Sequence, residues 1–421
     1  MGARSSVVCM NKGPRRGRKP FLPAFAWVTY DFANTMFSMF VGSMALPLYL
    51  RNLTGRDVYM GCGNMVSQLM AAVIGPAAGA VADRTGRNAR YMKIATAASI
   101  AFTAMLAASS SALWLVVVFV LANMTYNVAL PFYNALLRRV VPPSRRGFLS
   151  GLGVAAGNLG AAFVVLAIQP IVAGTGNYGK GFLATAGWFA LFALPAFLFL
   201  RDGEGASATS LRAAVAGWRS SLVTWAKLPG LGAFRNFLIA RFLYEEATNT
   251  VIVFMSVLAV HYAGVPEAKL GPVYMALIGS AVAGSLLSAF LVDRVGAKRV
   301  VTGVLLLWFA ALGLALFLSG TTGYLIFGCL AGVALGGLSS ADRPLLIELT
   351  PPEKTAEYFG FHALSGKISA SFGPVIFALV SDRLGYRAGI TVLLAFFAAA
   401  LAALAFVRVG RVAVGPRRVL S

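Results

Sequence analysis

The chain of 421 residues is 58% hydrophobic and only 12% charged, a composition far outside the range of soluble domains. A water-soluble enzyme or a soluble nucleic-acid-binding domain is therefore excluded as the main part of the molecule. Lysine and arginine outnumber the acidic residues by 36 to 14, which gives a formal net charge of +22.

Apolar runs follow one another along most of the chain, each about 20 residues long, the length that an α-helix needs to cross the hydrocarbon core. A lipid-exposed backbone must satisfy its own hydrogen bonds, and the alternating pattern of a barrel is absent, so each run predicts a helix. We predict an all-α membrane protein with twelve transmembrane helices, at roughly 24–50, 58–82, 91–109, 112–137, 148–173, 182–200, 236–262, 269–292, 300–319, 321–348, 359–381 and 388–408.

The placement of the basic residues predicts the topology. With a cytoplasmic N-terminus, the cytoplasmic segments hold 27 lysines and arginines and the opposite segments hold 6. This asymmetry follows the positive-inside rule with both termini in the cytoplasm. A nucleic-acid-binding protein would gather its cations on one folded surface, so we expect no nucleic-acid partner. We expect the chain to lie in a lipid bilayer, as an integral multi-pass protein of an inner or plasma membrane.

The only long polar segment between predicted spans is 201–235, and it divides the chain in two. Trp218 and Trp225 belong to an apolar stripe at helical spacing, which is typical of an amphipathic helix on the membrane surface. A short helix packed across the cytoplasmic mouth of the bundle fits the pattern equally well. The predicted parts are a basic tail 1–23, a six-helix bundle 24–200, the linker 201–235, a second six-helix bundle 236–408 and a tail 409–421.

Landmarks in the two bundles repeat at a nearly constant offset, which indicates a duplication. Tyr30-Asp31-Phe32-Ala33 in the first span matches Tyr244-Glu245-Glu246-Ala247 in the seventh, 214 residues later. Asp83-Arg84-Thr85-Gly86 matches Asp293-Arg294-Val295-Gly296, 210 residues later. The sequence therefore predicts two six-helix repeats.

These two Asp-Arg-x-Gly loops lie in short gaps between spans and are candidate gating elements. Glycine permits a tight turn and close helix approach, and the aspartate can cap a helix end or pair with arginine across the two halves. The alternative is that the arginines are only inside-positive anchors. The candidate gating residues are Gly79, Asp83, Arg84, Gly86 and Arg87 in the first copy and Asp293, Arg294 and Gly296 in the second.

Charged side chains inside spans are costly and usually face a cavity or one another. Asp31 lies in the first span, and Asn34 and Ser38 share its helix face. This face predicts a polar path, although a hydrogen-bonded packing cluster would show the same pattern.

In the seventh span, Arg241 and Glu245 are four residues apart and can pair on one face. Glu246 points about 100° away and lacks that partner, so we expect it to exchange a proton and prefer it as the coupling carboxylate. The alternative is that both glutamates are hydrated near the cytoplasmic interface.

The tenth span ends with Asp342 and Arg343, which are adjacent and should have different partners. Arg343 is expected to hold an anionic substrate group or to lock an inner gate against a carboxylate such as Glu246. Lys367 in the eleventh span either pairs with a carboxylate or binds substrate.

The sequence gives little indication of nucleotide binding, metal binding or catalysis. The glycine-rich stretches 151–160 and 328–337 have the spacing of close helix contacts and lack the Gly-Lys-Ser/Thr ending of a phosphate loop. Only three cysteines and two histidines occur, without catalytic or metal-ligand spacing. We expect no cofactor and no enzymatic activity.

The Asp-Arg-x-Gly-Arg turn, its second copy and the layout of two six-helix bundles resemble the major facilitator superfamily over nearly the whole chain. Tyr30-Asp31-Phe32-Ala33-Asn34-Thr35 is similar to the entry motif of one subgroup, the bacterial relatives of the fungal autophagy-related vacuolar amino-acid effluxers. Gly157-Asn158-Leu159-Gly160, Arg343 and Ser365-Gly366-Lys367 continue the similarity. The resemblance implies the major facilitator fold and secondary transport, with amino-acid efflux as the activity.

The sequence therefore predicts a secondary active transporter that moves a small solute by alternating access, with protons as the coupling ion. Asp31 and Glu246 are the coupling candidates, while Asn34, Asp342, Arg343 and Lys367 are candidates for binding substrate or closing a gate. Two alternatives remain. One is a metal-ion transporter that uses Asp31, Glu246 and Asp342 as oxygen ligands, and the other is a non-transporting membrane scaffold or assembly factor.

Overall fold

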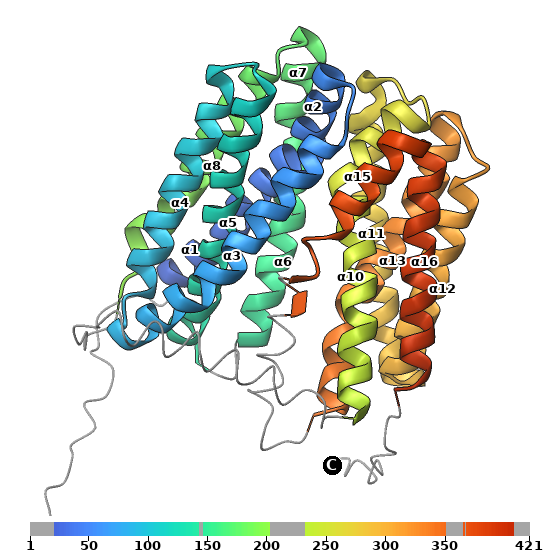
Figure 1. Cartoon of the computed structure of the whole chain (residues 1–421). Helices are drawn as coiled ribbons and strands as arrows, with labels where there is room; N and C mark the ends of the chain where they lie inside the picture. Colours follow the sequence, from blue (N-terminus) through green and yellow to red (C-terminus); the bar gives the residue numbers. More distant parts are fainter. Residues whose placement is uncertain (1–20, 143–145, 203–231, 351–364, 367, 408–421) are drawn as a thin grey trace, which may run out of the picture.

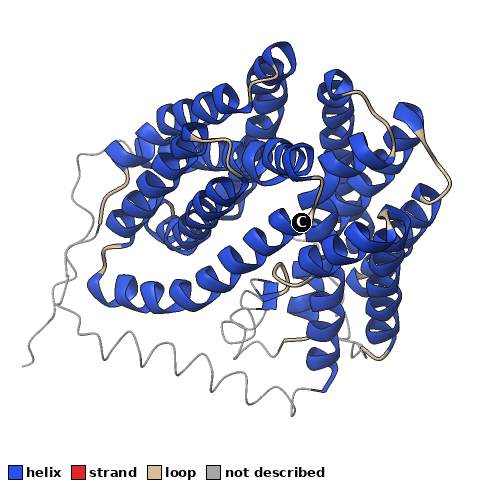
Figure 2. Ribbon diagram, turned by 45° about the horizontal axis from the view of Figure 1, so that its top comes forward, coloured by secondary structure: helices blue, strands red, loops and turns tan. Residues whose placement is uncertain are grey.

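The computed structural model describes residues 21–142, 146–202, 232–350, 365–366 and 368–407. Every regular element in these ranges is a helix, and they contain no strand (Figure 2). The expected amphipathic helix of the linker, Lys367 and most of the first part of the eleventh span lie outside the described residues.

The first half begins with one long helix whose middle is π-helical. Such wide turns are uncommon and often mark functional sites. The elements of this half are α1 (Phe21–Met36), η1 (Phe37–Ala45), α2 (Leu46–Thr54), α3 (Val58–Thr85), α4 (Asn88–Met105), η2 (Leu106–Ala108), α5 (Ala112–Val140), α6 (Arg146–Phe163), η4 (Val164–Ile168), α7 (Gln169–Thr175) and α8 (Tyr178–Phe199).

The second half repeats this plan, and its first helix also ends in a π-helical turn. Its elements are α10 (Gly232–Val257), η6 (Leu258–Tyr262), η7 (Glu267–Lys269), α11 (Leu270–Val295), α12 (Ala297–Ala315), α13 (Gly320–Glu348), α15 (Gly373–Leu384) and α16 (Tyr386–Ala405).

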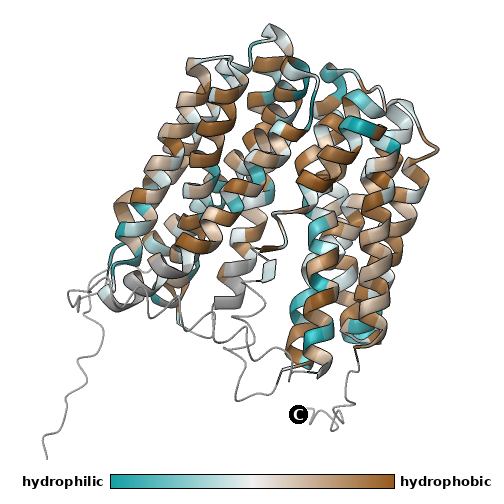
Figure 3. Cartoon of the chain, in the orientation of Figure 1, coloured by the Kyte–Doolittle hydropathy of each residue, from teal (hydrophilic) through white to brown (hydrophobic). Residues whose placement is uncertain are grey.

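Ten helices in the described ranges are long and apolar enough to cross a membrane, and they coincide with ten of the twelve predicted spans. The first predicted span corresponds to the continuous helix α1–η1–α2. The eleventh is described mainly as α15. Large apolar side chains such as Leu113, Leu166, Leu286 and Phe317 are exposed, as expected for surfaces that face lipid (Figure 3).

Glycines let the helices of each half approach closely, as the glycine-rich stretches predict. A Cβ at Gly160 of α6 would collide with the backbone of Phe32 on α1, and one at Gly336 of α13 would collide with Ala281 on α11. These contacts place α1 against α6 and α11 against α13 with their backbones nearly touching.

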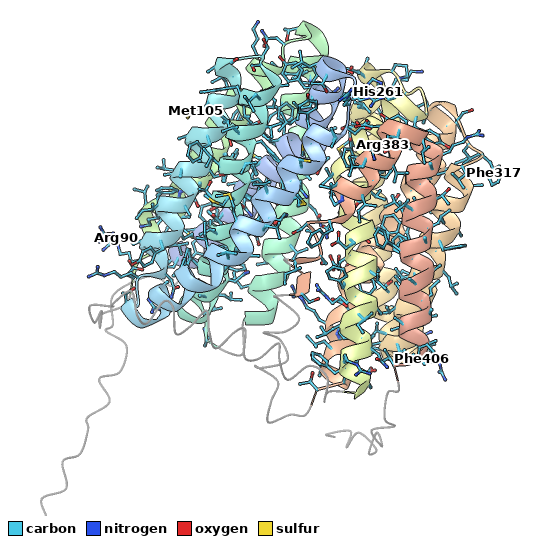
Figure 4. The ribbon with its side chains drawn as sticks, viewed as in Figure 1. Arg90, Met105, His261, Phe317, Arg383 and Phe406 are labelled. Carbon is cyan, nitrogen blue, oxygen red and sulfur yellow. The ribbon has the colours of Figure 1, made fainter. Side chains whose placement is uncertain are left out.

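The two halves stand side by side (Figure 1). They meet where the α2–α3 loop of the first half faces the α15–α16 loop of the second, at the end opposite the start of α1 and the end of α16. We call this the closed end. Figure 4 places His261 and Arg383 there, and Arg90 and Phe406 at the opposite end.

Candidate functional site

Asp31 lies where α1 packs against α5 and α6. A Cβ on Gly153 of α6 would collide with Asp31 Oδ2, and one on Gly157 would lie 3.0 Å from Thr35 Oγ1. The hydroxyl of Tyr133 on α5 faces the Asp31 carboxylate and donates to the carbonyl of Trp27 at 3.0 Å. Asp31 is therefore half-buried in a helix contact that only a glycine on α6 permits.

Asn34 extends this polar face one turn further along α1. The residue is 5% exposed, and the hydroxyl of Tyr126 faces both Asn34 and Ser38, so the expected shared face is present. Asn34 Oδ1 is buried and accepts no hydrogen bond from any described group. A buried acceptor without a donor is costly, and a ligand N–H group would satisfy it.

The second half holds a buried ion cluster around Arg241 of α10. Its Nε lies 3.0 Å from Asp342 Oδ2 of α13, and its Nη2 lies 3.3 Å from Glu245 Oε1, so the predicted Arg241–Glu245 pair is confirmed. Tyr244 donates a short hydrogen bond to the other oxygen of Asp342. Asp342 thus serves a contact within the second half.

Arg343 is exposed although its neighbour Asp342 is buried, so the two adjacent side chains lie in different surroundings. No ion pair to Arg343 is found among the described residues. Its role in binding substrate or locking a gate stays a prediction, as does that of Lys367.

Glu246 points away from the Arg241 cluster and is 1% exposed. Its carboxylate accepts hydrogen bonds from the backbone N–H groups of Phe372 and Gly373, at the start of α15. The positive end of a helix dipole favours a carboxylate in this place. Glu246 forms no ion pair with a cation in the described part of the chain, so its partner is the backbone, which the sequence did not indicate.

The two Asp-Arg-x-Gly loops make the expected turns. Gly86 ends α3 with φ 63°, and Gly296 joins α11 to α12 with φ 88°. Asp293 is exposed, and the Arg294 guanidinium lies 3.9 Å from the centre of the Phe290 ring. Gly79 lies within α3, and Arg87 is exposed. Pairing of these loops across the halves stays a prediction, since the side chains of Asp83 and Arg84 are outside the description.

A third copy of this pattern, Asp382-Arg383-Leu384-Gly385, joins α15 to α16 at the closed end. Gly385 (φ 85°, ψ 165°) closely matches Gly296 (φ 88°, ψ 151°). This third copy lies 89 residues after the second and is visible in the sequence, but it was not among the predicted gating residues.

Asp382 joins the two halves. Its carboxylate accepts hydrogen bonds from the backbone N–H of Asp57 at 2.8 Å and of Val58 at 3.0 Å, at the start of α3. It also pairs with Arg51 of α2 at 3.0 Å. The first two copies were expected to cap a helix or pair with arginine across the halves. At the closed end the third copy has this role, since its aspartate caps α3 across the interface and pairs with Arg51.

A second polar cluster joins the halves nearby. Glu267 of the second half accepts hydrogen bonds from Asn52 at 3.1 Å and Tyr178 at 3.2 Å, both in the first half. His261 Nε2 lies 2.8 Å from Asn52 Oδ1. Deeper in the interface, Asn64 of α3 donates to the carbonyl of Ala370 at 2.9 Å.

The helices α3 and α15 pack closely against each other across the interface between the halves. A Cβ on Gly61 of α3 would lie 2.9 Å from the carbonyl oxygen of Pro374 and 3.1 Å from the Cβ of Ala378. The described hydrogen bonds between the halves reach from the closed end to Asn64, and none is found nearer the start of α1.

In the ranges that the structure describes, no three His, Cys, Asp or Glu side chains gather in a way that could hold a metal ion. Asp31, Glu246 and Asp342, the proposed oxygen ligands of the metal-ion alternative, belong to separate contacts with Tyr133, Gly373 and Arg241.

Comparison with known proteins agrees with this architecture. A family model described as "Vacuole effluxer Atg22 like" matches residues 138–414, more than half of the chain. The chain belongs to this Atg22-like family. The uncharacterised MFS-type transporter YxiO of Bacillus subtilis (strain 168) is 24% identical over 404 residues, covering 91% of this chain and 94% of YxiO. Autophagy-related protein 22-2 of Aspergillus clavatus is 27% identical over 286 residues, covering 61% of this chain and 46% of that protein.

Solved structures of transporters share the fold of this Atg22-like protein. A mutant of the nucleoside transporter NupG superposes with a TM-score of 0.75 at 14% identity, covering 91% of this chain and 98% of the other. An inward-facing, occupied bacterial homologue of the human lysosomal transporter Spinster gives 0.68 at 14% identity, covering 93% and 97%. The predicted major facilitator fold is confirmed, and the chain is a membrane transporter of the MFS type.

Proposed function

We propose that this Atg22-like protein is a proton-coupled secondary transporter that exports amino acids by alternating access. The observation that carries the proposal is the position of two buried polar clusters, one on the first helix of each half, beyond a seal that joins the halves at one end. Rocking of the halves about such a central region is how repeated transporter folds expose a site to each side in turn.

The direction of opening follows from the charge asymmetry. The positive-inside rule places the start of α1 and the end of α16 in the cytoplasm, so the closed end faces outward. In this orientation the described hydrogen bonds between the halves close the outward end, and the solute would be loaded from the cytoplasm, as efflux requires.

Glu246 is our first choice for the coupling site, and Asp31 is the second. Glu246 is 1% exposed, and the donors to its carboxylate among the described residues are backbone N–H groups, so protonation removes no ion pair within the described part of the chain. A proton on this carboxylate would weaken its hold on the start of α15, the helix that seals against α3. Proton binding and rocking would thereby act on the same contact.

The solute chemistry rests on Asn34 and Arg343. The unsatisfied Oδ1 of Asn34 suits the ammonium group of an amino acid, and the exposed guanidinium of Arg343 suits its carboxylate. Arg241 is a poorer choice because Asp342 and Glu245 already engage it.

The proposal is tested by thermal unfolding of the purified protein in detergent against a panel of amino acids, peptides, organic acids and divalent cations, at pH 5.5 and 7.5. A ligand that binds the folded state raises the melting temperature by mass action. We expect stabilisation by amino acids that depends on pH, followed by uptake of the same compounds into proteoliposomes. Stabilisation by divalent cations alone would favour metal transport instead, and a wholly silent panel would contradict the proposal.

A further inference from the structure

Asp57, which lies just before α3 at the closed end, is one of the most buried charged residues in the described part of the chain. The residue is 1% exposed, and neither carboxylate oxygen completes a hydrogen bond with a described group. Its backbone N–H is already held by Asp382. A solvent-inaccessible carboxylate that completes no hydrogen bond is costly as an anion.

Two carboxylates share one cation here. Arg51 Nη1 lies 3.0 Å from Asp382 Oδ1 but 3.6 Å from Asp57 Oδ2. The shorter contact assigns the guanidinium to Asp382, so Asp57 is the carboxylate left with excess negative charge. One proton on Asp57 would leave a neutral acid beside a complete Arg51–Asp382 ion pair.

We propose that Asp57 is a proton-binding site of the closed end, which takes up a proton from the adjoining solvent when the halves close and releases it when they part. The inference rests on the alternating-access part of the proposed function, but not on the identity of the solute or on coupling through Glu246. The ligand is the proton itself, transferred from water to a carboxylate oxygen.

Groups from three described helices, α2, α15 and α16, face Asp57. These groups are Arg51 from α2, Asp382 and the Ser381 hydroxyl from α15, and the Tyr386 hydroxyl from α16. The Arg51 guanidinium also lies 5.3 Å from the centre of the Tyr386 ring. Opening the closed end removes α15 and α16, and it leaves Asp57 hydrated beside Arg51 alone.

The direction of the pH effect follows from this change. Burial raises the pKa of Asp57 from its usual 3.8 to about 6 in the closed form. Because the closed form binds the proton more tightly, closure is favoured as pH falls below about 6 and is disfavoured as pH rises through that value. A difference of about two pKa units shifts the open-to-closed ratio by at most about 100-fold between pH 8 and pH 4.

The test is a distance measurement between spin labels on Arg56→Cys and Arg383→Cys, in nanodiscs, with the native Cys9, Cys62 and Cys329 replaced by serine. Arg56 and Arg383 are exposed and lie on opposite halves of the closed end. The parent should show a short distance at pH 5 and a growing long-distance population toward pH 8. Asp57→Asn, which is neutral at every pH, should hold the short distance throughout.

Two variants separate Asp57 from its neighbours and from the proposed coupling site. His261→Gln should keep the transition of the parent. Glu246→Gln removes the carboxylate that holds the start of α15, so it should lower the closed population at every pH, yet the change in that population between pH 5 and pH 8 should remain. If opening is too rare to detect, thermal stability should still decline from pH 5 to pH 8 in the parent more steeply than in Asp57→Asn, because the same carboxylate is buried on folding. A pH response that Asp57→Asn retains in full, or a parent with no response in either measurement, overturns the proposal. Loss of the response in Glu246→Gln alone would transfer the proton site to Glu246.

Discussion

Glu246 on α10 accepts the backbone N–H of Gly373, the first residue of α15, whose last turn carries Asp382. The helix between these two carboxylates has 12 residues and is about 18 Å long. Glu246 therefore holds the start of α15, and Asp382 at the other end of the same helix holds the start of α3 in the first half. A short stiff helix connects the buried glutamate with the seal between the halves.

The third Asp-Arg-x-Gly copy should matter most in the described conformation. Asp382→Asn removes the charge that caps α3 and pairs with Arg51, and we expect a loss of about 1–2 kcal/mol from the closed form. Asp293→Asn is the matched control, since Asp293 is exposed and forms no described ion pair. Thermal unfolding of both variants checks this, and an equal effect of the two would contradict the assignment.

Close contact between α3 and α15 should depend on Gly61. A methyl group in Gly61→Ala would press on Pro374 and Ala378, and overpacking of this kind costs about 1–3 kcal/mol. We expect the halves to part more often, so that a cysteine introduced at Ala378 reacts faster with a membrane-impermeant maleimide in a background without native cysteines. Gly187→Ala, where a Cβ meets nothing within 4 Å, should leave the rate unchanged.

The packing of Asp31 against α6 can be tested with two neighbouring glycines. Gly153→Ala would drive a methyl group into the Asp31 carboxylate and the Trp27 ring, whereas a Cβ at Gly151 meets nothing within 4 Å. We expect Gly153→Ala to destabilise the protein by about 1–3 kcal/mol and Gly151→Ala to be nearly neutral. Similar melting temperatures for the two variants would show that α1 and α6 are not packed as described.

The buried cluster of the second half should behave as a coupled unit. Arg241→Met removes the guanidinium that lies 3.0 Å from the buried Asp342 carboxylate, and breaking a buried ion pair typically costs about 3–5 kcal/mol. Adding Asp342→Asn should recover part of that stability, because the remaining buried charge is removed. Denaturant unfolding of the single and double variants gives the coupling energy, and strictly additive effects would argue against a direct interaction.

Much of the architecture could be predicted because membrane physics leaves few choices. Span length, helix-only spanning and the positive-inside bias do not depend on detailed packing, and the offset between the halves shows in the spacing of Asp83 and Asp293. The Arg241–Glu245 pair could also be predicted, since it follows from helical spacing alone.

The features of the candidate site that could not be predicted depend on contacts between elements that are distant in sequence. Nothing near Glu246 indicates that the start of α15, some 127 residues later, supplies its hydrogen bonds. The contacts of Asp342 with Arg241 and Tyr244 of α10, about 100 residues earlier in the chain, were likewise not evident from the sequence, and its role in binding substrate or closing a gate stays a prediction. The third Asp-Arg-x-Gly copy was visible in the sequence. Its role in joining the halves follows only from the structure, in which the Asp382 carboxylate accepts the backbone N–H of Asp57 across the interface.

Coupling through Glu246 is the central claim, and its most direct test compares the parent with Glu246→Gln in proteoliposomes loaded with a solute identified by thermal unfolding. Transport driven by an imposed pH gradient and exchange of labelled for unlabelled solute without a gradient are measured side by side. We predict that Glu246→Gln abolishes the gradient-driven component and retains exchange, because glutamine keeps the shape of the side chain but cannot carry the proton. Gradient-driven transport at the parental rate in Glu246→Gln would contradict the claim and leave Asp31 as the coupling candidate.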